Sequence, residues 1–113
     1  MAATSPPTSR DAEIVRRVTA WQGVTAADGP RGELSLRYRR RELGHLHGDR
    51  VAHFAFPKDV WGELIAAGRV VPHPLDRPGL AARPLRDDSD VDETIALMRL
   101  NYDRAVAGEP RGR

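Results

Sequence analysis

The sequence predicts a small α+β domain in which a twisted antiparallel sheet carries its helices on one face. Three observations predict this fold: helical apolar spacing near both ends of the chain, strict alternation in residues 34–38, and turn-forming residues between further short apolar segments. The predicted order of elements is α-β-β-β-α-β-α. The chain has 113 residues, enough for one hydrophobic core and too few for two, so a single domain is expected over residues 9–107.

The first predicted element is a helix from about Ser9 to Gly23, which follows a leader, residues 1–8, that is expected to be disordered. The apolar residues of this helix recur at helical spacing: Ile14, Val18 and Trp21. Residues 26–32 (AADGPRG) are expected to form a loop, because Gly, Pro and Asp favour turns.

Three strands joined by two short turns are predicted next, as an antiparallel meander. In the first strand, residues 34–38, the alternation places Leu34, Leu36 and Tyr38 on the buried face. The other two strands are residues 42–47 and 51–56, with turns at residues 39–41 and 48–49.

The second half of the chain predicts a helix, a strand and a last helix. Pro57 suits the first turn of a helix that ends at Gly68, and residues 70–79, with three prolines, suit an irregular connection. Residues 80–85 are expected to form a strand at or near an edge of the sheet, because Pro84 cannot donate a hydrogen bond.

The last helix is predicted to begin near Asp90 and to continue to about Val106. Ser89 and Asp92 have the spacing of a capping box, with Asp in place of Glu. The apolar stripe of this helix comprises Val91, Ile95, Met98 and Tyr102. Residues 108–113 are expected to be a frayed tail.

The composition excludes several classes of protein. The chain has no cysteine, which excludes disulfides, thiolate metal sites and cysteine nucleophiles. No apolar stretch approaches the ~18 residues of a membrane helix, and the N-terminus lacks the pattern of a secretory signal, so a cytoplasmic protein is predicted. The net charge is only +2, because 18 basic residues are balanced by 16 acidic ones.

The densest group of reactive side chains lies in residues 39–50 (RRRELGHLHGDR). On a strand, His45 and His47 point to the same face, with Cβ atoms roughly 6–7 Å apart, whereas Gly44 and Leu46 point towards the helices. We expect the exposed face to bind a small ligand or a partner. The candidate binding residues are Arg37, Arg41, Glu42, His45, His47, Asp49 and His53.

The same residues are open to catalytic and structural interpretations. His45 or His47 beside a carboxylate can act as a general base, with an arginine orienting an anionic substrate. In the structural interpretation the histidines bond to the backbone and the hairpin is held by surface ion pairs. The residues that would pair in this hairpin are Arg41, Glu42 and Asp49.

A metal site and a nucleic-acid site are two further hypotheses. His45 and His47 can share a metal ion with Asp49 or His53 as third ligand, but two histidines at this spacing often occur by chance, and no metal or other cofactor is predicted. The arginines near residue 40 form a basic patch, but Tyr38 is the only aromatic residue beside them that could stack on bases. The predicted partner is therefore an unknown small ligand or protein, without nucleic acid or membrane, for a monomer or homodimer.

Four segments of the chain resemble a known family: AWQGV (20–24), RRELGHLHGDRVAHFAFP (40–57), AAGRVVPHP (66–74) and MRLNYDRA (98–105). They are similar to a small bacterial family, common in actinobacteria, that is labelled luciferase family or luciferase domain. The resemblance covers about residues 13–106, and RELGHLHGD is its most specific part. The chain departs from the family pattern at residues 76–80, which lack an Asp-Ser-Gly-Trp-like segment, and at His53, where an acid is common.

The label does not imply light emission, because a flavin luciferase of the barrel type needs about 250 residues. The order of elements from Val51 to Val106 is also similar to the MmcQ/YjbR family, which implies a YjbR/frataxin-like fold. Together, the residues and the resemblance predict a luciferase-family domain that binds a small ligand or a partner without catalysis. A small enzyme and a nucleic-acid-binding module are the alternatives.

Overall fold

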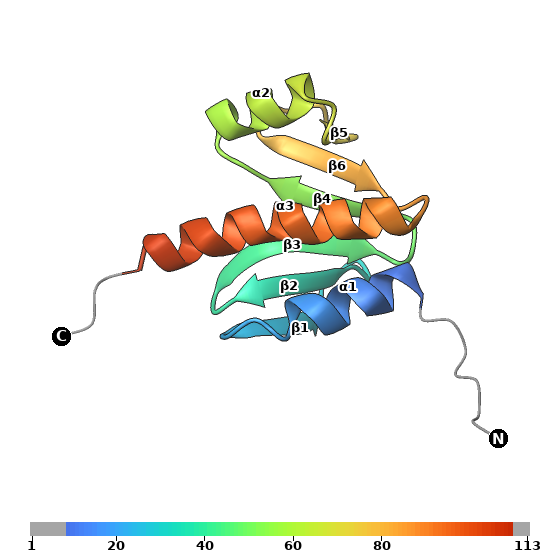
Figure 1. Cartoon of the computed structure of the whole chain (residues 1–113), viewed down its shortest axis with the longest axis vertical. Helices are drawn as coiled ribbons and strands as arrows, with labels where there is room; N and C mark the ends of the chain where they lie inside the picture. The colour runs from blue at the N-terminus through green and yellow to red at the C-terminus, as the bar shows by residue number, and fades with distance from the viewer. Residues whose placement is uncertain (1–8, 110–113) are drawn as a thin grey trace.

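The computed structural model describes residues 9–109 and confirms the predicted α+β fold (Figure 1). A six-stranded antiparallel sheet has the order β1-β2-β3-β4-β6-β5. The elements are α1 (Arg10–Val18), β1 (Val24–Asp28), β2 (Leu34–Tyr38), β3 (Arg41–His47), β4 (Val51–Ala55), α2 (Lys58–Ala66), β5 (Val71–Pro72), β6 (Leu80–Pro84) and α3 (Asp88–Ala107). The predicted elements occur in the predicted order, and β1 and β5 extend the sheet. The predicted leader, residues 1–8, and the end of the predicted tail, residues 110–113, lie outside the described residues.

Strand β1 corrects part of the prediction that residues 26–32 form a loop: residues 26–28 belong to the strand, and residues 29–32 lie in the predicted loop. Val24 to Asp28 pair residue by residue with β2, from Val24 opposite Tyr38 to Asp28 opposite Leu34. Only Val24 is buried in this edge strand, so its small, exposed residues carry no alternation of apolar and polar side chains. The strand therefore depends on main-chain pairing, which the sequence pattern does not report.

The ends of two helices also differ from their predicted positions. Helix α1 ends at Val18, so Trp21 lies in the turn that follows, and Gly23 takes a left-handed φ of 83° there. Helix α3 is capped by Asp87, whose side chain accepts a hydrogen bond from the Asp90 N–H. Ser89 therefore lies inside the first turn, and the predicted capping box is wrong because the helix begins two residues earlier.

The core lies between one face of the sheet and the helices. Helix α3 runs across the sheet and α1 lies beside it, over β1 and β2, whereas α2 lies near β6 (Figure 1). Buried side chains from both layers fill the space between them: Ile14, Val18, Leu36, Leu43, Leu46, Ala52, Phe54, Val91, Ile95, Leu97 and Met98. The predicted apolar stripe of the last helix is thus confirmed for Val91, Ile95 and Met98. Its fourth member, Tyr102, is partly buried and packs against Tyr38 and Trp21.

A β-bulge at Leu43 decides which side chains of β3 share a face. Leu36 is opposite Gly44, but the next residue, Arg37, is opposite Glu42, so Leu43 has no partner in the ladder. In a regular strand, residues three apart point to opposite faces, and an extra residue reverses this relation. The buried Asn101 of α3 holds the bulge, because its Nδ2 donates hydrogen bonds to the carbonyls of Leu43 at 3.0 Å and Ala55 at 3.2 Å.

Strand β6 lies next to the edge of the sheet, as its proline predicts. Pro84 is its last residue and pairs with Val51, and only the two-residue β5 lies beyond it. No helix within residues 9–109 combines the length and the apolar character needed to cross a membrane.

Candidate functional site

All four histidines of the sequence gather on the sheet face that points away from α1 and α3. This histidine cluster comprises His45, His47, His53 and His73. His45 of β3 is directly opposite His53 of β4, and His47 lies on the same side of β3. The ring centroids are 5.0 Å apart for His45 and His47, 5.2 Å for His45 and His53, and 4.5 Å for His47 and His53. The inward-facing residues that alternate with them, Gly44 and Leu46, are buried as predicted.

His73 joins the cluster from the connection between β5 and β6. Its ring centroid lies 4.2 Å from that of His53. The residue opposite His53 on β6 is Ala82, and its small methyl group leaves room above the sheet for the His73 ring. The Leu75 N–H donates a hydrogen bond to His73 Nδ1 at 3.0 Å. The sequence gives no sign of this contact, because His73 is 20 residues from His53 in an irregular segment.

A chain of hydrogen bonds supports His45 from the side. Its Nδ1 lies 3.2 Å from Glu42 Oε2, and the other carboxylate oxygen of Glu42 accepts a hydrogen bond from the buried Ser35 hydroxyl at 2.7 Å. Arg37 Nε donates in turn to Ser35 Oγ at 3.0 Å. The bulge at Leu43 makes this possible, because it turns Glu42 to the same face as His45. The carboxylate thus fixes which nitrogen of the imidazole carries the proton.

The cluster favours neutral imidazoles. Burial, together with the neighbouring histidines, lowers the pKa of His53 to about 4. Burial is also the main cause that lowers the pKa of His47 and of His73, and the positive charge that His45 would carry adds to it. The hydrogen bond from His45 lowers the pKa of Glu42. At neutral pH, therefore, His47, His53 and His73 are uncharged and the carboxylate beside His45 is ionised.

A hollow of about 390 Å³ adjoins the histidine cluster. Its wall includes the cluster, the apolar side chains of Pro74, Leu75 and Leu80, and the charged residues Arg31 and Glu33. Glu33 Oε1 accepts a hydrogen bond from the Arg31 N–H at 2.8 Å, which folds the loop before β2 against the site. These two charged residues carry no signal in the sequence, because nothing in their pattern distinguishes them from ordinary loop residues.

Three of the histidines are also close enough to share an ion. One ring nitrogen from each of His45, His47 and His53 lies within 4.8 Å of the other two. Of the two predicted third ligands, His53 lies beside His45 and His47, whereas Asp49 does not belong to this set.

Comparison with known proteins gives one match. A sequence model of the family described as "Luciferase domain" matches residues 40–101, which is more than half of the chain. The chain belongs to the luciferase domain family. The matched segment contains all four histidines and Asn101. No curated protein and no solved structure matches this luciferase-family chain.

Two predicted site residues of the luciferase-family domain lie away from the histidines. Asp49 Oδ1 accepts a hydrogen bond from the Asp11 N–H at 2.8 Å, so it ties the β3–β4 turn to the start of α1. Arg41 begins β3 at the opposite end of the strand. Since Glu42 is bonded to Ser35 and His45 instead, the predicted ion pairs among Arg41, Glu42 and Asp49 are not formed in the β3–β4 hairpin.

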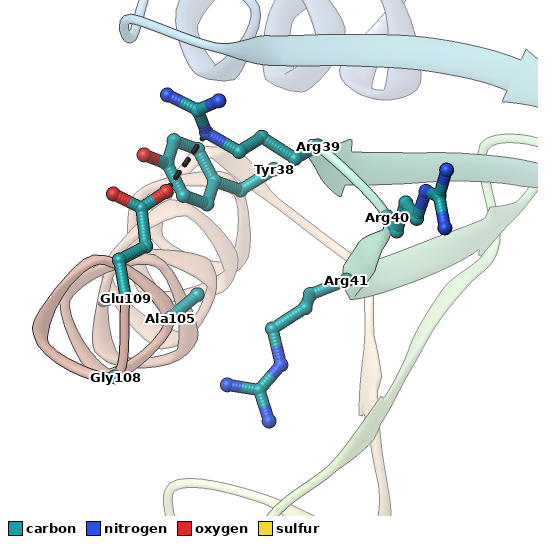
Figure 2. Close-up of a pocket in the computed structure, with 7 residues that line it drawn as sticks. All are labelled: Tyr38, Arg39, Arg40, Arg41, Ala105, Gly108 and Glu109. Atoms are coloured by element: carbon teal, nitrogen blue, oxygen red, sulfur yellow. Dashed lines mark ion pairs between the residues drawn. The ribbon is translucent and has the colours of Figure 1, made fainter. Parts of the chain in front are cut away.

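A separate arginine groove of the luciferase-family domain, about 560 Å³ in volume, is lined by Tyr38, Arg39, Arg40, Arg41, Ala105, Gly108 and Glu109. Figure 2 shows Arg39 turned towards Glu109 at the end of α3, with Arg40 turned away from it. Arg39 Nε lies 2.8 Å from Glu109 Oε1, so the groove contains a neutralising partner for one of its three cations. Its aromatic residue, Tyr38, is only 6% exposed and has no free ring face for a base.

Proposed function

We propose that this luciferase-family domain is a non-catalytic binding module for a small ligand, and that the histidine cluster is its binding site. The observation that carries the proposal is the gathering of all four histidines of the chain on one open face, from β3, β4 and the β5–β6 connection. Three of them lie on one hairpin, but His73 is 20 residues beyond His53, and ordinary surface packing gives no reason for it to join them. Clusters of groups with displaced pKa values mark functional sites.

The hollow beside the cluster favours a small ligand over a protein partner. Its volume of about 390 Å³ is at the lower end of the range, roughly 300–1,000 Å³, that small-molecule sites occupy. Its wall combines apolar side chains, neutral imidazoles and the charged residues Arg31 and Glu33. Small-molecule sites have this mixture of an apolar surface and a few polar groups.

An enzyme is the second candidate, and the contact between His45 and Glu42 favours it. An imidazole oriented by a carboxylate, 3.2 Å away, is the arrangement of a general base. In this alternative the other nitrogen, Nε2, would accept a proton from a substrate in the hollow, and Arg31 would orient an anionic group of that substrate. This alternative would be identified if the protein converts a substrate and the His45→Gln variant still binds that substrate but no longer converts it.

A nucleic-acid-binding role is the third candidate, and two observations argue against it. Tyr38, the aromatic residue nearest the arginines, is buried under Tyr102 with ring centroids 5.1 Å apart, so it cannot stack on a base. Glu109 pairs with Arg39 within the groove. Binding of single-stranded nucleic acid with a steep dependence on salt would support this role against the proposed one.

The proposed function can be tested by recording ¹H–¹⁵N spectra of the full chain with a panel of probes. The panel contains divalent metal ions, small carboxylates, inorganic phosphate and nucleotides. We expect at least one probe to shift the signals of residues 31–35, 45–53 and 73–75, and His47→Ala to abolish the shift. Arg41→Gln, in the arginine groove, is the matched control and should respond like the natural chain. Shifts confined to residues 39–41, or none with any probe, would overturn the proposal.

A further inference from the structure

We propose that His45, His47 and His53 form a binding site for a divalent transition-metal ion of the zinc class, with one coordination position left open to the adjoining hollow. This inference rests on the proposed function, because it names the ligand of the same histidine cluster. It is carried by the geometry of the three rings, by the hydrogen bonds of His45 and His73, and by the position of the hollow.

The three rings are positioned by the sheet itself. His45 and His53 face each other across paired strands, and His47 is two residues further along β3. Their ring nitrogens lie within 4.8 Å of one another, whereas nitrogens bound tetrahedrally to one zinc ion at about 2.1 Å are about 3.4 Å apart. Small rotations of the side chains close this difference, and the strands need not move.

Glu42 supplies the outer-sphere contact that metal-bound histidines usually have. Its Oε2 accepts a hydrogen bond from His45 Nδ1–H at 3.2 Å, which leaves the lone pair on Nε2 free for a metal ion. The Ser35 hydroxyl and Arg37 hold the carboxylate in turn. A purely structural histidine has no need of such a chain, and within residues 9–109 no protein group hydrogen-bonds the ring nitrogens of His47 or His53.

His73 lies beside the site without being a ligand. Its Nδ1 accepts the hydrogen bond from Leu75 N–H, so in the neutral ring the proton is on Nε2 and neither nitrogen has a free lone pair. Three histidine ligands leave one position of a tetrahedral ion for a water molecule or an anion. The hollow of about 390 Å³ that the same histidines line has room for that group.

The donor set also selects the class of ion. Neutral imidazoles suit Zn²⁺, Co²⁺, Ni²⁺ and Cu²⁺, whereas Mg²⁺ and Ca²⁺ require oxygen ligands. The carboxylates of Glu42 and Glu33, which adjoin the cluster, are engaged with His45 and with the Arg31 N–H. We therefore expect the site to bind zinc-class ions and not to bind Mg²⁺.

The test is calorimetric titration of the full chain, without a histidine tag and freed of metal with EDTA, using Zn²⁺ and Mg²⁺. We expect one Zn²⁺ per chain with a Kd on the order of 1 µM or tighter and no heat with Mg²⁺. His53→Ala and His47→Ala should each weaken Zn²⁺ binding by more than about 100-fold, and Glu42→Gln by about 10–100-fold. His73→Ala should weaken it by less than about tenfold, and Arg41→Gln should leave it unchanged.

The open position is tested by replacing Zn²⁺ with Co²⁺, whose visible absorption reports its ligands. We expect bands of a tetrahedral ion that change when azide is added, because azide takes the fourth position. The open three-histidine site would be overturned if the absorption bands do not change when azide is added. It would also be overturned if His73→Ala weakens metal binding as much as His53→Ala does. ¹H–¹⁵N spectra of each variant show whether it is folded.

The two proposals fail in different ways. No Zn²⁺ binding, together with shifts at the cluster from a carboxylate or phosphate probe, would overturn the metal site and leave the binding module standing. No response at the cluster to any probe would overturn both proposals. Zn²⁺ binding that survives the loss of His47 and His53 would place the ion elsewhere and also overturn this site.

Discussion

The side chain of His53 links the stability of the metal-free protein to pH. An ordinary histidine has a pKa of 6.5, but burial and the neighbouring imidazoles lower the pKa of His53 to about 4. Between these two values the unfolded chain binds a proton at this residue and the folded protein does not. The free energy of unfolding must therefore rise with pH across this window, and the stability is lost as the pH falls towards 4.

We expect this dependence to show in urea unfolding followed between pH 4 and 7 in the presence of EDTA. At about 1.4 kcal/mol per pKa unit, and after a discount for the partial exposure of the ring, His53 contributes on the order of 1–2 kcal/mol. His53→Asn has no charge to gain, so its unfolding curves should depend less on pH by this amount. Equal slopes for the two proteins would show that the pKa of His53 is ordinary.

At the scale of the elements, the bulge in β3 is the feature on which the site depends. Asn101 holds it by donating to the carbonyls of Leu43 and Ala55. Asn101→Ala leaves the buried Leu43 carbonyl and the partly buried Ala55 carbonyl without these donors, which should lower the free energy of unfolding by about 1–3 kcal/mol. It should also loosen the contact between Glu42 and His45, because their common face depends on the bulge.

Urea unfolding measures the stability effect of Asn101→Ala, and the ¹H–¹⁵N signals of the His45 ring report its effect on the site. Arg104→Ala is the control, since the Arg104 side chain donates to the side-chain oxygen of Asn101, at 2.9 Å, and the substitution leaves the Nδ2 group of Asn101 in place. This control should lose much less stability and keep the His45 ring signals. Unchanged His45 ring signals in Asn101→Ala would show that the contact between Glu42 and His45 does not depend on the bulge.

The packing of α3 on the sheet makes a second prediction at this scale. Ile95 is 8% exposed and belongs to the core, so Ile95→Ala should lower the free energy of unfolding by about 2–5 kcal/mol through the cavity it leaves. Ile95→Val removes one methylene group from the same position and should cost about 0.5–1.5 kcal/mol. Thermal or urea unfolding of both variants measures whether Ile95→Ala is less stable than Ile95→Val. If both variants are as stable as the natural chain, this side of α3 faces solvent.

At the scale of the whole molecule, metal binding should stabilise the fold. The ligands come from β3 and β4, which lie at the centre of the sheet, so unfolding separates them. An ion that binds only the folded chain stabilises it by about 2.7 kcal/mol at 100 times its Kd. For a domain of this size, the Tm should rise by roughly 10 °C or more.

Differential scanning fluorimetry with and without Zn²⁺ measures this rise in Tm. The His47→Ala variant should show almost none of it, whereas Arg41→Gln should show all of it. A similar rise in every variant would mean that Zn²⁺ acts at another place on the molecule.

Local patterns in the sequence were enough to predict the fold class, the meander of β2, β3 and β4, and the outward direction of His45 and His47. These features depend on periods of two or 3.6 residues and on turn-forming residues, which are properties of neighbouring positions. The edge strand β1 was missed for the same reason, because four of its five residues are exposed and their pattern has no period.

The site itself was decided by the tertiary structure. His73 reaches His53 from a segment with no regular structure, and the bulge at Leu43 turns Glu42 towards His45. Asp49 and Arg41, which are close to the histidines in sequence, are carried to other parts of the molecule. Contacts between separate strands and loops depend on register, on bulges and on the space left by small residues such as Ala82. None of these is encoded in the spacing of residues along one strand.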